Sequence, residues 1–216
     1  MKEPRADVPS ETAIGALDEG ARLAALRDEI GRALARGSSL RAALQQCADA
    51  LQQLLEPAAA FVWTFTDRPD VLVLQAHAGA PGLRALFERV ALSAGPIGLI
   101  ARTRAPQSAP LPGTELVISG QPLLVEDRVV GVVGLVSSQA LPLLVQRELA
   151  ALALAAAQFV ERKHAEGALL EREERLRLMT EQVPGILWSI DRELRFTSGS
   201  GAGLRALGLE PDSLVG

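Results

Sequence analysis

The spacing of apolar residues changes period along this 216-residue chain. From Asp18 to Arg36, and again from Leu40 to about Glu56, apolar residues recur every three or four positions, which is the period of an amphipathic helix. Gly37 ends the first helix, either of the next two serines can cap the second, and Pro57 closes it. The first third of the chain therefore predicts two consecutive helices.

Residues 59–77 follow a period of two instead. Phe61, Trp63 and Phe65 alternate with smaller residues and fall on one face of an extended strand. Asp67–Asp70 has the composition of a turn, and Val71–His77 is a second β-rich run. This segment predicts an antiparallel hairpin.

The next sixty residues mix short helices with strands. The pattern predicts helices over 83–92 and 96–104, an irregular proline-containing loop over 105–114 and a short strand over 115–119. Two β-rich runs then flank the polar turn Glu126-Asp127-Arg128, between Gln121 and Ser137. A helical pattern with no proline after Pro142 follows from Leu141 to Met179. Shorter strands and a helix are expected over 186–190, 194–197 and 201–207. The order of elements predicts an α+β fold, an antiparallel sheet with flanking helices and a long C-terminal exit helix. Residues 1–17 lack a period and are expected to form a flexible N-terminal tail.

Composition excludes several classes of protein. The net charge is −4, aromatic residues make up 3%, and no basic stripe is present, which argues against a nucleic-acid partner. Cys47 is the one cysteine, so no intramolecular disulfide or cysteine-rich zinc site can form. The first ten residues lack the apolar core of a signal peptide, and the longest strongly apolar run, Leu149–Ala157, is too short to span a bilayer. We therefore expect a cytoplasmic protein without membrane insertion.

No catalytic or metal-binding pattern stands out. His77 and His164 have no second histidine, cysteine or carboxylate pair at metal-ligand spacing. Gly199–Gly203 lacks both the third glycine of a dinucleotide fingerprint and the Gly-Lys-Ser/Thr of a phosphate loop. We therefore expect no catalytic residues and no metal site, and no enzymatic activity in this chain.

Three segments resemble a GAF domain: the 61–75 hairpin, Gly95–Pro106 (GPIGLIARTRAP) and Gln121–Val136 (QPLLVEDRVVGVVGLV). The resemblance implies a GAF-like sensor domain over 18–160 with a small-molecule pocket between the sheet and the 82–104 helices. The residues expected to line that pocket are Trp63, Phe65, Leu74, Phe87 and Ile100. The chain is shorter than the family between Pro106 and Gln121, a segment that usually helps to close the pocket.

The same resemblance raises the question of cofactors. Some GAF domains bind cyclic nucleotides through an Asn-containing motif, and this chain has no Asn. Cys47 lies in the first helical region and not where the family carries a bilin, and a haem at His77 has little support. No cofactor is required by the sequence.

Residues 183–216 resemble the beginning of a PAS domain. Trp188, Asp191, Phe196, Gly208 and Pro211 fall where that pattern expects them, and only about forty residues of the fold are present. We expect an incomplete PAS-like α/β segment that is marginally packed. Such a segment implies a downstream output domain in a longer protein.

Residues 161–182 join the two parts as a charged helix. Leu169, Leu176 and Val183 are seven residues apart and Met179 adds an offset of three, which is the seam of a short coiled coil. This pattern predicts a parallel homodimer, with a solvated single helix as the alternative. Gly167 is a candidate flexible point.

Taken together, the resemblances imply the sensory or regulatory input region of a signal-transduction protein, a histidine kinase or a diguanylate cyclase. It would relay a GAF-domain signal through a dimeric helix to a PAS domain. The alternative is a ligand-free GAF dimerisation scaffold, which the short 105–120 segment favours. A catalytic role like that of the GAF-like methionine sulfoxide reductase would need cysteines that this chain lacks.

Overall fold

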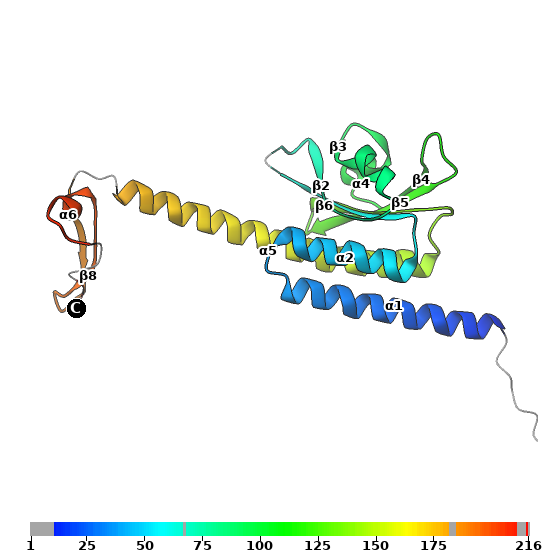
Figure 1. The fold of residues 1–216 in the computed structure, drawn as a ribbon, viewed down its shortest axis with the longest axis horizontal. Coiled ribbons are helices and arrows are strands. Elements are labelled where there is room, and N and C mark those ends of the chain that lie inside the picture. Colours follow the sequence, from blue (N-terminus) through cyan, green and yellow to red (C-terminus); the bar gives the residue numbers. More distant parts are fainter. Residues whose placement is uncertain (1–10, 67, 182–184, 211–214, 216) are drawn as a thin grey trace, which may run out of the picture. The chain divides into compact units, whose positions relative to one another are not determined.

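The computed structural model describes residues 11–66, 68–181, 185–210 and 215. These residues divide into two compact units, 1–163 and 164–216, each of which is described by itself. The first unit contains a six-stranded antiparallel sheet with helices on both faces (Figure 1). The second unit contains a two-stranded sheet and a short helix.

The sheet of the first unit has the strand order β3-β2-β1-β6-β5-β4. Its strands are β1 (Ala59–Phe65), β2 (Val71–Gly79), β3 (Arg89–Ala91), β4 (Gln107–Pro110), β5 (Val117–Val125) and β6 (Arg128–Ser137). The β1–β2 and β5–β6 hairpins are both present as the sequence predicts, and β1 pairs with β6 to join them. Glu126, in the β5–β6 turn, takes a left-handed φ of 52°.

Helices α1 (Glu11–Arg36), α2 (Leu40–Leu55) and α5 (Leu143–Glu181) cover one face of the sheet. Helices α2 and the first half of α5 lie directly on the strands, and α1 packs on them from outside (Figure 1). Ser39 caps α2 by accepting a 3.3 Å hydrogen bond from the Ala42 N–H, as expected of one of the two serines. The leucines predicted to face inward from the first helix, Leu23, Leu26 and Leu34 among them, are buried.

The opposite face is covered by shorter elements. These are α3 (Pro81–Arg84), the 3₁₀ turn η1 (Ala85–Phe87) and α4 (Gly95–Thr103). They pack on Phe61, Trp63, Leu72 and Val132 in a second, smaller apolar cluster. The sheet thus separates two cores, a large helical one and a small aromatic one.

Three of the predicted elements differ in the structure. The tail expected over 1–17 is wrong for residues 11–17, which form the first turns of α1, while residues 1–10 lie outside the described residues. The helix expected over 83–92 ends at Phe87, because Arg89–Ala91 pairs with Val71–Val73 as strand β3. The loop expected over 105–114 contains strand β4, which pairs with β5.

The strand predicted over 115–119 is not separate. It is the beginning of β5, which runs on through Pro122 to Val125. Strand β4 pairs with β5 only as far as Gly120. At Pro122 the side of β5 toward β4 is therefore an edge, where the missing N–H of proline can be tolerated.

The second unit follows the order of elements that the sequence predicts. Strand β7 (Leu187–Ile190) pairs with β8 (Phe196–Ser200), and α6 (Ala202–Ala206) follows. Trp188 and Phe196 contact each other edge to face, at 5.7 Å between ring centroids. Trp188 is nevertheless 66% exposed, and among the described residues from 185 onwards only Gly199, Gly201 and Leu204 are buried. The sparse burial agrees with the expected marginal packing.

Candidate functional site

An aromatic cluster occupies the sheet face where the sequence predicts a ligand pocket. The rings of Phe61 and Trp63 stack at 5.2 Å with an interplanar angle of 11°, and Phe87 of η1 packs edge-on against both. The Trp63 indole Nε1–H donates a 2.8 Å hydrogen bond to the Phe87 carbonyl oxygen. One buried indole therefore holds the covering segment to the sheet through both its ring and its polar atom.

Two glycines in neighbouring strands make room for this arrangement. A Cβ on Gly134 would lie 3.0 Å from the Trp63 ring, and one on Gly120 would lie 2.7 Å from the Ile100 side chain. Gly120 and Gly134 are paired across β5 and β6. The glycine in the Val-Gly-Leu part of the GAF-like motif thus has a local role, because any side chain there would press on Trp63.

All five residues predicted to line the pocket lie in this one cluster. Trp63 and Ile100 are fully buried, while Phe65, Leu74 and Phe87 are partly buried. They contact one another as apolar core, and the groove, pocket and cavity described below are lined by other residues. The structure brings the predicted residues together in one apolar cluster.

His77 belongs to the same face, opposite Phe61 in the β1–β2 pair, with their rings 4.9 Å apart. Its Nε2 is buried and makes no hydrogen bond within the described part of the chain. Burial lowers the pKa of His77, as does the charge of Arg84, against the opposing effect of a hydrogen bond to the Ala80 backbone. His77 is therefore held toward its neutral form.

The backbone of His77 is clamped from the helical side. Gln45 of α2 donates from Nε2 to the His77 carbonyl at 2.8 Å and accepts from the His77 N–H at 3.3 Å. Strand β3 pairs with β2 only from Val71 to Val73, so at His77 the carboxamide takes the place of a neighbouring strand. Sequence periodicity gave no sign of this contact, because Gln45 lies at a partly buried position of an otherwise regular helix.

The structure gives no support for a haem at this histidine. Nε2 of His77 is buried, and the centroid of its ring lies 4.9 Å from that of the Phe61 ring. Among the residues that the structure describes, no three His, Cys, Asp or Glu side chains lie close enough together to hold a metal ion.

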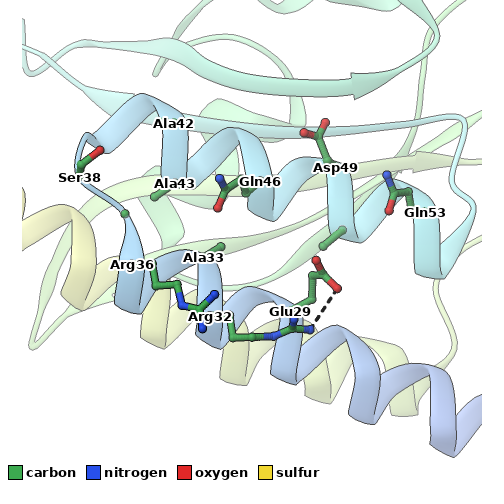
Figure 2. A pocket seen from close by; sticks show the side chains of 12 residues that line it. Glu29, Arg32, Ala33, Arg36, Ser38, Ala42, Ala43, Gln46, Asp49 and Gln53 are labelled. Atoms are coloured by element: carbon green, nitrogen blue, oxygen red, sulfur yellow. Dashed lines mark hydrogen bonds and ion pairs between the residues drawn. The ribbon is translucent and has the colours of Figure 1, made fainter.

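A second feature, a groove of about 500 Å³, runs between α1 and α2 (Figure 2). Its floor is made of small residues, including Ala33, Ala43 and Ala50, and its walls are polar. Figure 2 labels Glu29, Arg32 and Arg36 on α1 and Gln46, Asp49 and Gln53 on α2 among the residues that line it. Arg32 Nη2 is paired with Glu29 at 3.3 Å, so the groove has charges of both signs. In the sequence, the alanines on the inner faces of both helices were the feature that could have predicted this groove.

Cys47 lies in the helical core. A small apolar cavity of about 20 Å³ adjoins it, lined also by Leu44, Leu51 and Leu152. Burial raises the pKa of the Cys47 thiol to about 12. A thiol that is both buried and protonated at neutral pH is a poor nucleophile.

Helix α5 contains the residues predicted for dimerisation. Leu169, Leu176 and Met179 are 58%, 56% and 53% exposed, and Val183 lies outside the described residues. By length and composition α5 contains a window apolar enough to cross a membrane, with a mean hydropathy of 1.4. Its apolar residues Leu149, Leu152 and Val160 are packed in the core of the first unit.

Comparison with known proteins identifies the fold. No protein-family model matches the sequence, and no curated protein matches it significantly. Solved structures do match, and the chain is similar to the GAF domain of a phosphoenolpyruvate-protein phosphotransferase from Coxiella burnetii, with a TM-score of 0.59 and 18% identity over 71% of this chain and 98% of that one. It is also similar to the GAF domain of a putative sensor histidine kinase from Pseudomonas syringae pv. tomato, with a TM-score of 0.53 and 17% identity over 73% and 97%.

A third similar structure is an enzyme, the free methionine-R-sulfoxide reductase from Neisseria meningitidis in complex with its substrate. The TM-score is 0.57, with 17% identity over 67% of this chain and 93% of the reductase. Likeness at this level of identity establishes the architecture. The chain has a GAF-like fold, an antiparallel sheet with flanking helices and a long C-terminal helix.

Proposed function

We propose that this chain is the sensory or regulatory input region of a signal-transduction protein. The observation that carries the proposal is the division of α5 into a buried and an exposed half. From Val145 to Val160 one side of the helix is part of the sheet's core, whereas all residues from His164 to Met179 are exposed. One continuous helix thus belongs to the core at one end and presents leucines to solvent at the other.

Specific polar contacts tie the buried half of α5 to its surroundings. Arg27 of α1 pairs with Glu148 at 2.6 Å, and Arg128 of β6 pairs with Glu161 at 2.6 Å. The Arg162 guanidinium donates to the Leu34 carbonyl at the end of α1. A change in the sheet or in α1 would therefore act on α5 directly, as a switching helix requires.

The exposed half of α5 supports a homodimeric relay. Leu169, Leu176 and Met179 would form the seam between two parallel helices. In the proposed arrangement the relay passes to the PAS-like segment and then to an output domain, a histidine kinase or a diguanylate cyclase. The similarity to the GAF domain of a sensor kinase favours the histidine kinase.

Introducing charged residues into the seam of the intact chain tests the proposed dimer. Leu169→Glu combined with Leu176→Glu should convert a dimer to a monomer in light scattering coupled to size exclusion, because like charges would face each other along the seam. The matched control is Leu170→Glu with Leu178→Glu, which changes two equally exposed leucines of the same helix off the seam. An unchanged dimer in the seam variant, or dissociation by both pairs alike, would contradict the relay.

A second candidate function is a ligand-free dimerisation scaffold. It is favoured by the aromatic cluster, where Phe87 packs edge-on against Phe61 and Trp63 is completely buried. A ligand at 100 times its dissociation constant stabilises a protein by about 2.7 kcal/mol, which a thermal shift detects. A metabolite panel that leaves the melting temperature unchanged, with the dimer intact, would favour the scaffold over the sensor.

We also propose that the chain is not itself an enzyme. Its cysteine lies in the core of the first unit, away from the aromatic cluster on the opposite face of the sheet. An activity lost in Cys47→Ala would overturn this part of the proposal.

A further inference from the structure

A pocket of about 160 Å³ lies on the helical side of the sheet, at its β4–β5 edge. Its walls come from Ser108 of β4, Ser119 and Gln121 of β5, Leu141 just before α5, and Gln146 and Leu149 at the beginning of α5. The aromatic cluster lies on the other face of the sheet, so the two places are distinct. Of the nine residues that line this pocket, none is charged.

Polar residues occupy strand positions that usually hold core side chains. Ser119 and Gln121 point to the same face of β5 as Leu123, which is fully buried in the helical core. Ser119 is 3% exposed and Gln121 is 8% exposed. Burying a hydroxyl and a carboxamide costs free energy unless their hydrogen bonds are made, so their presence here needs an explanation.

The protein satisfies only part of this hydrogen-bonding capacity. Ser108 Oγ donates to Ser119 Oγ at 2.8 Å, and Gln121 Nε2 donates a long bond of 3.3 Å to the Gln146 carbonyl. The Gln146 Nε2 is already committed to the Leu141 carbonyl at 2.7 Å. Within the described residues no partner is found for the second N–H of Gln121 or for its Oε1, and Oε1 is not sealed from the pocket.

These groups define the chemistry of an occupant. One free donor and one free acceptor on a carboxamide complement the same pair of groups on a second carboxamide. The neighbouring hydroxyls can donate or accept, and Leu141 and Leu149 provide an apolar wall. A carboxylate or an ammonium group would lose its hydration there without meeting an opposite charge.

We infer that this pocket binds a small uncharged molecule bearing a primary carboxamide or urea group. Gln121 would recognise the amide edge, with Ser108 and Ser119 alongside. Because Gln146 and Leu149 belong to α5, an occupant would contact the exit helix directly, without passing through the aromatic cluster. This site and the sheet-face site can therefore be tested separately.

The test is a two-dimensional ¹⁵N NMR titration of the whole chain with acetamide, and in parallel with acetate, which has the same shape and carries a charge. Acetamide should shift the side-chain NH₂ signals of Gln121 and Gln146 and the backbone signals of Ser108 and Ser119, saturating in the millimolar range because the probe has so few atoms. Acetate should bind about tenfold more weakly or not at all.

Substitutions in the pocket test whether acetamide binds at this site. Ser119→Ala removes one hydroxyl without adding bulk and should weaken acetamide binding about threefold or more, and Gln121→Leu should abolish it. The control is Ser137→Ala on the adjacent strand β6, whose hydroxyl bonds to the Gln139 carbonyl outside the pocket and whose loss should change nothing. Ser119→Ala keeps the inference testable if Gln121→Leu fails to fold.

Equal responses to acetate and acetamide would overturn the inference. So would shifts that grow linearly without saturation, or that persist unchanged in Ser119→Ala.

Discussion

Replacing Phe87 by alanine is the sharpest probe of the aromatic cluster. A fully buried Phe→Ala change costs about 3–5 kcal/mol. Phe87 is only partly buried, but it contacts both Phe61 and Trp63 edge-on. We therefore expect Phe87→Ala to lower the free energy of unfolding by about 2–3 kcal/mol.

That loss corresponds to a fall in melting temperature of about 4–12 °C for a chain of this size. The Trp63 indole bonds to the backbone carbonyl of residue 87, which the substitution keeps, so the variant isolates the ring from the hydrogen bond. The assay is thermal unfolding followed by circular dichroism, with Leu86→Ala as the matched control. Leu86 is 66% exposed, and its truncation should change stability by no more than about 0.5 kcal/mol.

Phe87→Ala also tests whether the site of the Phe87 ring can bind a ligand or is only core. The space left by the ring faces Phe61 and Trp63, so indole or benzene should bind there and restore part of the lost stability. An unchanged melting temperature in Phe87→Ala, or an equal loss in Leu86→Ala, would refute the packing argument.

The remaining predictions concern His77, whose pKa is lowered, and Cys47, whose pKa is raised. Because burial lowers the pKa of His77, the unfolded chain binds the proton more readily, so stability is full above the ordinary value of about 6.5 and is lost as pH falls through the lowered folded value. Urea unfolding between about pH 5 and 8 should show the free energy of unfolding falling as the pH falls, and His77→Leu should flatten this dependence. An unchanged pH dependence in the variant would show that another group causes it. Because burial raises the pKa of Cys47 to about 12, the native thiol should resist a disulfide reagent at pH 8 and react on unfolding, and rapid native labelling would contradict its burial.

The sequence pattern predicted those elements that extend over many residues. The alternation of Phe61, Trp63 and Phe65 fixed both the strand and its face, because a slip by one residue would move all three rings to the opposite, helical face of the sheet. The long helix was equally plain, since no proline interrupts α5.

Strands β3 and β4 could not be predicted in this way. Each is three or four residues long, lies at an edge of the sheet and depends on pairing with a distant partner, so neither has a period of its own. The candidate site was hard to predict for a related reason. The resemblance placed Trp63 and Phe87 in one pocket but did not tell that their rings would contact each other. The buried Ser119 and Gln121 looked like ordinary polar residues of a strand.

The exposure of every residue from His164 to Met179 has a thermodynamic consequence for the exit helix. A helix of some sixteen residues without tertiary packing is only marginally stable in water, and Gly167 costs about a further 1 kcal/mol relative to alanine. Its order would then depend on a partner, so association and helix formation would occur as one coupled process. A signal reaching this segment need not displace a rigid body, because shifting the balance between frayed and helical chains would itself change how tightly two copies associate.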